Sequence, residues 1–161
     1  MECLTRRYKH AIRTGRTSAL LFTDLDNFKM VNDVHGHQRG DEVFIMLAEL
    51  LDRSVRETDV TARFGSEEFA VWLDEISEAD AITKTSLMIK ASQSLEAYSG
   101  SPDYPVRLSI GIAAFDPASG ETSEALIARA DAAMYEAKFN GKGTYALTPP
   151  FTTTNQEEAT S

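Results

Sequence analysis

The sequence predicts an α+β fold in which helices flank a central, mostly antiparallel sheet of five strands. Short apolar or β-branched runs alternate along the chain with longer runs of helical periodicity, in the order helix, strand, helix, helix, hairpin, helix, strand, helix, strand. Two of the short runs, "VTARF" and "FAVWL", are separated by four residues and therefore form an antiparallel hairpin. The 161 residues, of which 42% are hydrophobic, suit one domain with a sizeable core.

The elements of the first half follow from local patterns. "SALLFTDLDNF" begins as a continuous apolar run, which predicts a buried strand over residues 19–23 with Asp24 and Asp26 at its carboxyl end. "FKMVNDVHGH" predicts a short helix that ends at Gly36. In "GDEVFIMLAELLDRSVRE", the apolar residues that share one face of an amphipathic helix are Val43, Leu47, Leu50 and Leu51.

The second half alternates between helices and strands. "SEAD" (residues 77–80) is a Ser-x-x-acid helix start, and the face of the following helix carries Met88, Ala91, Leu95 and Tyr98. "VRLSIGIAAF" predicts a strand over residues 106–115, "TSEALIARADAAMYEAKFNGKG" a capped helix ending in glycines, and "TYAL" the last strand. The domain is expected to span residues 1–147, and the polar residues 148–161 are expected to form a disordered tail.

The composition disfavours several classes of function. The net charge of −9 argues against binding a DNA or RNA polymer, although a metal ion or a few cations can still neutralise a small nucleotide. Cys3 is the only cysteine, so no intrachain disulfide forms, which is compatible with a reducing cytoplasm. No apolar run approaches membrane-spanning length, and there is no secretory signal pattern. We expect a cytoplasmic domain with no membrane contact of its own; any anchor lies in other parts of a parent protein.

Four acidic residues are candidates for a metal site. In the predicted sheet, the end of the first strand can lie beside the hairpin tip, which brings Asp24 and Asp26 within reach of Glu67 and Glu68. Mg²⁺ prefers carboxylate and carbonyl oxygens and takes further ligands from water and substrate phosphates. Acidic residues from the strand end and from the hairpin tip, together with the carbonyl of Leu25, can supply about half of the Mg²⁺ coordination shell. Solvated acids at loop ends are the alternative for each pair taken alone.

Three lysines are candidates for phosphate contacts: Lys29, Lys138 and Lys142. Lys29 lies one turn into a predicted helix, and the other two lie near a glycine-rich helix end. The helix dipole favours lysine at a carboxyl end without any ligand, so this alternative stays open.

Four blocks in this order resemble the GGDEF domain, the diguanylate cyclase family. They are "FTDLDNFKMVNDVHGHQRGDEV", "RETDVTARFGSEEFAVWL", "LSIGIA" and "ADAAMYEAKFNGKG", and the resemblance covers roughly residues 2–147. "ECLTRRYKHAI" resembles only the second half of the family's N-terminal Thr-Gly-Leu-x-Asn-Arg-Arg block, so we expect a domain excised from a longer sensor protein. The resemblance implies a palm-like sheet, as in nucleotidyl cyclases and polymerases.

The resemblance implies a reaction in bacterial signalling and biofilm control. Each domain of an antiparallel homodimer holds one GTP, and each 3′-hydroxyl attacks the α-phosphate of the other GTP. The products are cyclic di-GMP and two pyrophosphates, and the cofactor is Mg²⁺, with Mn²⁺ as a substitute. A single subunit holds half of the reactants, so an isolated monomer is expected to be inactive.

The resemblance also implies roles at the acidic cluster. Asp24 and Glu67 match the metal-binding carboxylates, with the Leu25 carbonyl beside them. Glu68 matches the second signature acid, which binds metal or activates the hydroxyl, and Glu68 and Lys29 are the candidate catalytic residues.

Other positions match nucleotide contacts of the family. Asn32 and Asp41 match the pair that reads guanine, and Asp at position 41, where makers of the mixed GMP–AMP product often have Ser, favours cyclic di-GMP. Phe28 is expected mainly to pack. The remaining candidate contacts are His37, Gly65, Ser66, Lys138 and Lys142.

"RETD" (residues 56–59) matches the family's Arg-x-x-Asp site for inhibition by product. Arg56 can fork onto a phosphate or a guanine edge, Asp59 can accept guanine donors, and Arg63 is expected to assist. The alternative is an exposed salt pair at a helix end, which contributes little to stability.

Ser66 is the main departure from the family pattern, because it replaces the second signature glycine. Glycine lets the backbone approach the α-phosphate and adopt a positive φ, whereas serine costs about 1 kcal/mol if φ is positive. Since the metal acids, the guanine pair and the lysines are present, we expect a cyclase whose activity is retained or reduced. The alternatives are a catalytically impaired receptor for GTP or cyclic di-GMP, and a purely structural dimerisation domain.

Overall fold

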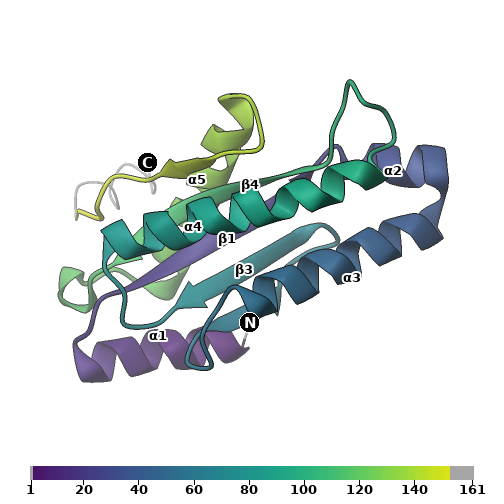
Figure 1. Cartoon of the computed structure of the whole chain (residues 1–161). Helices are drawn as coiled ribbons and strands as arrows, with labels where there is room; N and C mark the ends of the chain where they lie inside the picture. Colours follow the sequence, from purple (N-terminus) through teal and green to yellow (C-terminus); the bar gives the residue numbers. More distant parts are fainter. Residues whose placement is uncertain (1, 153–161) are drawn as a thin grey trace.

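The computed structural model describes residues 2–152 and shows a five-stranded sheet with helices on both faces (Figure 1). The strands are β1 (Ser18–Asp26), β2 (Val60–Arg63), β3 (Glu68–Leu73), β4 (Arg107–Phe115) and β5 (Tyr145–Leu147), in the order β2-β3-β1-β4-β5. Neighbouring strands are antiparallel except β5, which runs parallel to β4. The predicted fold class is confirmed.

Two hydrophobic cores lie on opposite faces of the sheet. One face is covered by α2 (Phe28–His35), α3 (His37–Arg53) and α4 (Glu78–Ser92), and the other by α1 (Glu2–Thr14) and α5 (Ser123–Phe139). Along β1, Ala19, Leu21 and Leu25 enter the first core, whereas Leu20 and Phe22 enter the second. Because successive side chains point to opposite faces, a strand buried on both faces reads as the continuous apolar run seen in the sequence.

Some element boundaries differ from the sequence prediction. β1 continues three residues beyond Thr23, because its ladder with β4 extends to the pair Asp26 and Arg107. Asp24 is therefore a strand residue and does not lie in a following loop. Likewise, Glu68 begins β3 and does not lie in the turn. The fourth helix ends at Ser92 and continues as a 3₁₀ helix (Gln93–Tyr98).

Two single residues explain where α4 begins and how closely α5 packs on the sheet. Ser77 Oγ accepts a hydrogen bond from the backbone of Asp80, which confirms the predicted start of α4. At Gly111 on β4, a Cβ atom would lie 2.2 Å from backbone atoms of Ala130 and Met134 on α5. The glycine thus lets α5 pack directly on the sheet.

No helix among residues 2–152 is long and apolar enough to cross a membrane.

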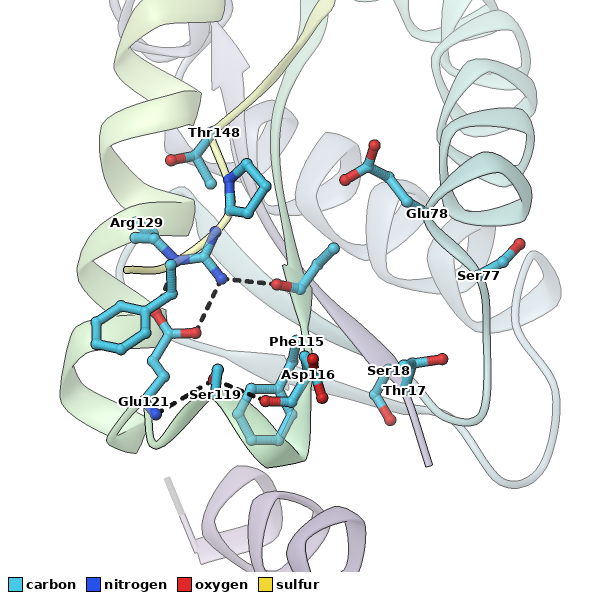
Figure 2. Close-up of a pocket in the computed structure, with 13 residues that line it drawn as sticks. Thr17, Ser18, Ser77, Glu78, Phe115, Asp116, Ser119, Glu121, Arg129 and Thr148 are labelled. Atoms are coloured by element: carbon cyan, nitrogen blue, oxygen red, sulfur yellow. Dashed lines mark hydrogen bonds and ion pairs between the residues drawn. The ribbon is translucent and has the colours of Figure 1, made fainter. Parts of the chain in front are cut away.

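The chain beyond β5 stays attached to the domain at a pocket near the amino end of β1 (Figure 2). There the buried carboxylate of Glu121 pairs with Arg129, whose Nε lies 2.6 Å from its Oε2. The same guanidinium donates to the backbone oxygens of Ala114 and Pro149. Contacts of the domain therefore extend past Leu147, and residues 153–161 of the expected tail lie outside the described residues.

Candidate active site

The acidic residues meet where β1 and β3 lie side by side. Asp24 on β1 is the register partner of Glu68, and Glu67 immediately precedes Glu68. Antiparallel pairing of two strands that are distant in sequence thus produces the predicted approach of Asp24 to the two glutamates. The site lies at the opposite end of β1 from the Glu121–Arg129 pocket.

Crowding makes this cluster attractive to a cation. Burial raises the pKa of Asp24 above its ordinary value, although contact with Lys138 opposes the rise. Burial and the charge of Asp24 likewise raise the pKa values of Glu67 and Glu68. A positive charge in addition to Lys138 would favour the ionised forms of these carboxylates and so oppose the rise in their pKa values.

Asp24 has a free oxygen suited to a hard divalent cation. Its Oδ1 is buried and has no hydrogen-bond partner among the described residues, whereas its Oδ2 lies 2.8 Å from Lys138 Nζ. A buried polar atom without a hydrogen-bond partner is unusual. Mg²⁺ and Mn²⁺ prefer carboxylate oxygens as ligands, and this oxygen lies beside two further carboxylates. The residues present therefore fit the metal that the family resemblance implies.

Asp26 differs from Asp24 although both side chains lie on the same face of β1. The Asp26 carboxylate is fully buried and accepts hydrogen bonds from Ser109 Oγ at 2.8 Å, Gly143 N at 2.9 Å and Lys138 Nζ at 3.2 Å. Its oxygens are engaged by donors of the chain. The sequence analysis grouped Asp26 with the candidate metal ligands, and this grouping is wrong. Asp26 instead joins β1 to β4, α5 and the loop after α5.

The three candidate lysines differ in their contacts, and within residues 2–152 Lys138 is the one that pairs with the acidic cluster. Lys138, in the last turn of α5, bridges Asp24 and Asp26. Lys142, in the loop after α5, donates to Asn27 Oδ1 at 3.2 Å, and Lys29 is exposed on α2. Packing of α5 and the following loop against β1 thus brings Lys138 and Lys142 to the end of β1, whereas no hydrogen bond or ion pair among the described residues joins Lys29 to the acidic residues.

Gly40 leaves room for the side chain of Asn32, one residue of the predicted guanine-reading pair. Asn32 on α2 lies against Gly40 on α3, where a Cβ atom would come 1.8 Å from Asn32 Oδ1. Asp41 follows Gly40 and is exposed. Phe28 is 7% exposed and belongs to the core, so it packs and does not present a free surface to a ligand.

The turn before β3 has no left-handed residue at Gly65 or Ser66. The conformational cost considered for Ser66 therefore does not arise. The turn is closed by Phe64 N and Gly65 N, which both donate to Glu68 O. Any effect of Ser66 must come from its side chain facing a ligand.

The Arg-x-x-Asp motif forms a clamp around a buried carboxylate. The side chain of Asp59 is 0% exposed and accepts from Arg56 N and Asp74 N, each at 2.8 Å. The Arg56 guanidinium contacts Asp59 and donates to the backbone oxygen of Asp74. Burial acts to raise the pKa of Asp59, but these donors outweigh it and lower the pKa. The exposed-pair alternative is wrong, and the Asp59 carboxylate is not free to accept guanine donors in this conformation.

Lys84, which the sequence analysis missed, joins this motif. Its Nζ on α4 lies 3.6 Å from Asp59 Oδ2, and Arg56 and Lys84 line one surface pocket. Arg63 lies at the other end of β2, with its guanidinium 4.3 Å above the Phe44 ring. No local pattern links Lys84 to Asp59, because their contact depends on how α4 packs.

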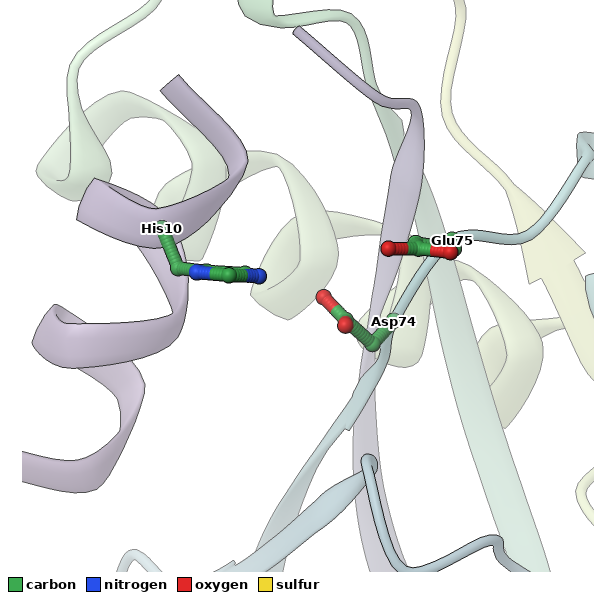
Figure 3. A group of neighbouring side chains, drawn as sticks. All are labelled: His10, Asp74 and Glu75. Carbon is green, nitrogen blue, oxygen red and sulfur yellow. The ribbon is translucent and has the colours of Figure 1, made fainter. Parts of the chain in front are cut away.

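A second group of potential metal ligands lies at the end of β3 away from Glu68. His10 on α1, Asp74 and Glu75 place ligand atoms within 4.8 Å of one another (Figure 3). Glu75 already forms a 2.6 Å ion pair with Arg16. These side chains connect α1 to the loop that follows β3.

Comparison with known proteins assigns the family. The family described as "Diguanylate cyclase, GGDEF domain" matches residues 1–144. The chain belongs to the GGDEF domain family. The bifunctional diguanylate cyclase/cyclic di-GMP phosphodiesterase MucR of Pseudomonas aeruginosa is 38% identical over 156 residues, which cover 96% of this chain and 22% of MucR. This GGDEF domain spans between 22% and 37% of the length of the first curated relatives that it matches.

Solved GGDEF structures share the fold. The GGDEF domain of DgcB from Caulobacter crescentus, in complex with c-di-GMP, has a TM-score of 0.80 and 29% identity, covering 91% of this chain and 86% of that one. The active GGEEF domain of a diguanylate cyclase from Vibrio cholerae has a TM-score of 0.79 and 25% identity, covering 91% and 92%. The five-stranded sheet described above is thus the sheet of GGDEF domains.

Proposed function

We propose that this GGDEF domain condenses two GTP molecules into cyclic di-GMP and two pyrophosphates across an antiparallel homodimer. The observation that carries the proposal is the buried Oδ1 of Asp24, which lies beside Glu67 and Glu68 and accepts no hydrogen bond from residues 2–152. The similarity to a domain described as active in a diguanylate cyclase, and to one described in complex with c-di-GMP, supports it.

The acidic cluster would hold a divalent cation, Mg²⁺ or Mn²⁺, through Asp24, Glu67 and the carbonyl of Leu25. When bound, such a cation neutralises charge on the triphosphate and on the reacting oxygens. Glu68 is the proposed acceptor of the 3′-hydroxyl proton, and its raised pKa brings a carboxylate closer to the range in which a general base works well.

The remaining residues orient the nucleotide. Asn32 and Asp41 bind the guanine edge, where the Asp41 carboxylate accepts from the N1–H and the amino group. Lys29 and Lys142 neutralise the outer phosphates. In the reaction, a bond forms between the 3′-oxygen and the α-phosphorus as the bond to the pyrophosphate oxygen breaks. Holding two substrates face to face replaces a bimolecular encounter, an effect that can reach roughly 7–11 kcal/mol.

Product inhibition is proposed at the surface formed by Arg56 and Lys84. The Arg56 side chain is 48% exposed and its guanidinium is oriented by the buried Asp59 carboxylate. In this arrangement the two cations bind the phosphates of cyclic di-GMP, and Asp59 positions Arg56 without contacting the base.

The test uses the domain fused to a dimeric coiled coil and incubated with GTP and Mg²⁺, with cyclic di-GMP and pyrophosphate both measured. Glu67→Ala should abolish turnover while leaving the melting temperature close to that of the parent. Absence of both products, with cyclic di-GMP binding still measurable, would favour the receptor alternative and reject the enzyme.

A second measurement tests the inhibitory site. Lys84→Ala and Arg56→Ala should leave initial turnover in place and relieve inhibition by added cyclic di-GMP. Since Arg56 also holds the Asp59 clamp, its variant is compared with Lys84→Ala at matched thermal stability. Inhibition that is unchanged in both variants would exclude this site.

A further inference from the structure

The ammonium group of Lys138 lies on the carboxylate that the proposed function assigns to the divalent cation. Lys138 Nζ is 2.8 Å from Asp24 Oδ2 and 3.2 Å from Asp26 Oδ1. The Lys138 side chain is 22% exposed, and those of Asp24 and Asp26 are 14% and 0% exposed. The chain therefore places a positive charge of its own inside the acidic cluster.

The Lys138 ammonium is held in this position by ion pairs to two carboxylates, those of Asp24 and Asp26. A divalent cation and an ammonium on the same carboxylate repel each other, and the repulsion is stronger in a partly buried site than in water. Occupation of Asp24 by Lys138 thus opposes occupation by a metal.

Asp26 makes this contact reversible. Ser109 Oγ and Gly143 N continue to satisfy the Asp26 carboxylate if the lysine turns away, so its departure leaves no buried oxygen of Asp26 without a partner. Lysine has a flexible four-carbon stem with rotatable donors, so its ammonium can reach a neighbouring phosphate without movement of α5.

We propose that Lys138 is an internal counter-ion of Asp24 that competes with the divalent cation until a triphosphate draws the lysine away. The inference builds on the proposed metal site at Asp24. In the nucleotide-free domain, Lys138 weakens metal binding. The triphosphate supplies negative charge for both the ammonium and the metal, so nucleotide and cation bind together and strengthen each other's affinity.

The experiment measures Mn²⁺ affinity without nucleotide, by the electron paramagnetic resonance signal of free Mn²⁺. Lys138→Met should bind Mn²⁺ about tenfold more tightly than the parent domain, the change expected from about 1.4 kcal/mol of lost competition. Lys90→Met is the matched control, because it removes an exposed lysine on α4 that has no role in the proposed site and should leave Mn²⁺ affinity unchanged. Asp24→Asn combined with Lys138→Met should abolish the gain, which locates the ion.

The same titrations with the non-hydrolysable analogue guanosine α,β-methylene triphosphate test the coupling. The analogue should tighten Mn²⁺ binding more in the parent domain than in Lys138→Met. The proposal is overturned if Lys138→Met binds Mn²⁺ no more tightly than the parent domain without nucleotide, or if Lys90→Met shows an equal gain. Lys138→Gln repeats the test if the methionine variant unfolds. Failure of the proposed cyclase activity would be a separate result, because the first titration contains no GTP.

Discussion

At the residue scale, the serine in the signature turn shows how a departure from the family pattern can be tolerated. Ser66 lies between Gly65 and Glu67 in a turn that contains no positive φ at its glycine or serine. The backbone hydrogen bonds to Glu68 O that close this turn do not involve the Ser66 side chain. What remains for Ser66 to influence is the space in which a phosphate would lie.

We therefore expect Ser66→Gly to separate stability from activity. The unfolding free energy should change by less than about 0.5 kcal/mol, because no strained conformation is relieved. Turnover of GTP should rise severalfold as the hydroxymethyl group is removed. Ser66→Ala, which keeps the bulk but removes the hydroxyl, is the control. Equal turnover in all three proteins would show that position 66 does not face the phosphates.

Gly40 gives a second prediction at this scale. A methyl group there would come 1.8 Å from Asn32 Oδ1, which is the end of a flexible side chain and can turn away. Gly40→Ala should therefore preserve the melting temperature, since alanine favours the helix by up to about 1 kcal/mol, and should raise the KM for GTP about tenfold by displacing Asn32. Asn32→Ala should give a similar KM. An unchanged KM in Gly40→Ala would argue against guanine recognition by Asn32.

At the element scale, the chain places its functional groups by joining strand and helix ends through buried carboxylates. Asp26 connects β1 to β4, α5 and the loop after α5, and Asp59 connects the segment before β2 to the end of β3. Both carboxylates are inaccessible to solvent. Each therefore fixes the relative position of elements on which candidate ligand-binding residues lie.

The Asp59 clamp predicts a pH-dependent stability. Because the folded-state pKa of Asp59 is lowered, its contribution is present above the unfolded-state pKa and is lost as the pH falls through the folded-state pKa. Asp59→Asn should lower the unfolding free energy at pH 7 by about 2 kcal/mol. The gap between the two proteins should narrow below about pH 4, the unfolded-state range. Denaturant unfolding across pH measures this, with the exposed Asp52→Asn as control. A gap independent of pH would contradict the clamp.

At the scale of the whole molecule, one domain would bind one of the two GTP molecules that the proposed reaction consumes. In the proposed reaction each domain binds one GTP at Asp24, Glu67 and Glu68, so the attacking hydroxyl comes from a second copy. Turnover per domain should therefore increase in proportion to protein concentration while most of the protein is monomeric. Fusion to a dimeric coiled coil should remove this dependence. Concentration-independent turnover by a domain shown to be monomeric would contradict the two-domain reaction.

Much of the architecture could be predicted from the sequence because local physics encodes it. Side-chain periodicity of two or 3.6 residues reveals strands and helices, and the Ser77 cap shows where α4 begins. The short hairpin connection requires β2 and β3 to be antiparallel, and the apolar run of β1 indicates burial on both faces. These features also predict that Asp24 lies near Glu67 and Glu68.

Local patterns in the sequence thus predict the fold class, the family resemblance and the approach of Asp24 to Glu67 and Glu68. Which acids are available depends on tertiary contacts: within residues 2–152, an Asp24 oxygen has no hydrogen-bond partner, Asp26 and Asp59 are enclosed, and Lys138 lies between Asp24 and Asp26. The structure also shows that the basic residue near Arg56 is Lys84 and not the expected Arg63. The physical reason is that burial and charge pairing depend on contacts between residues far apart in the sequence, such as Asp26 and Lys138, which are 112 positions apart. A local sequence pattern cannot predict such contacts.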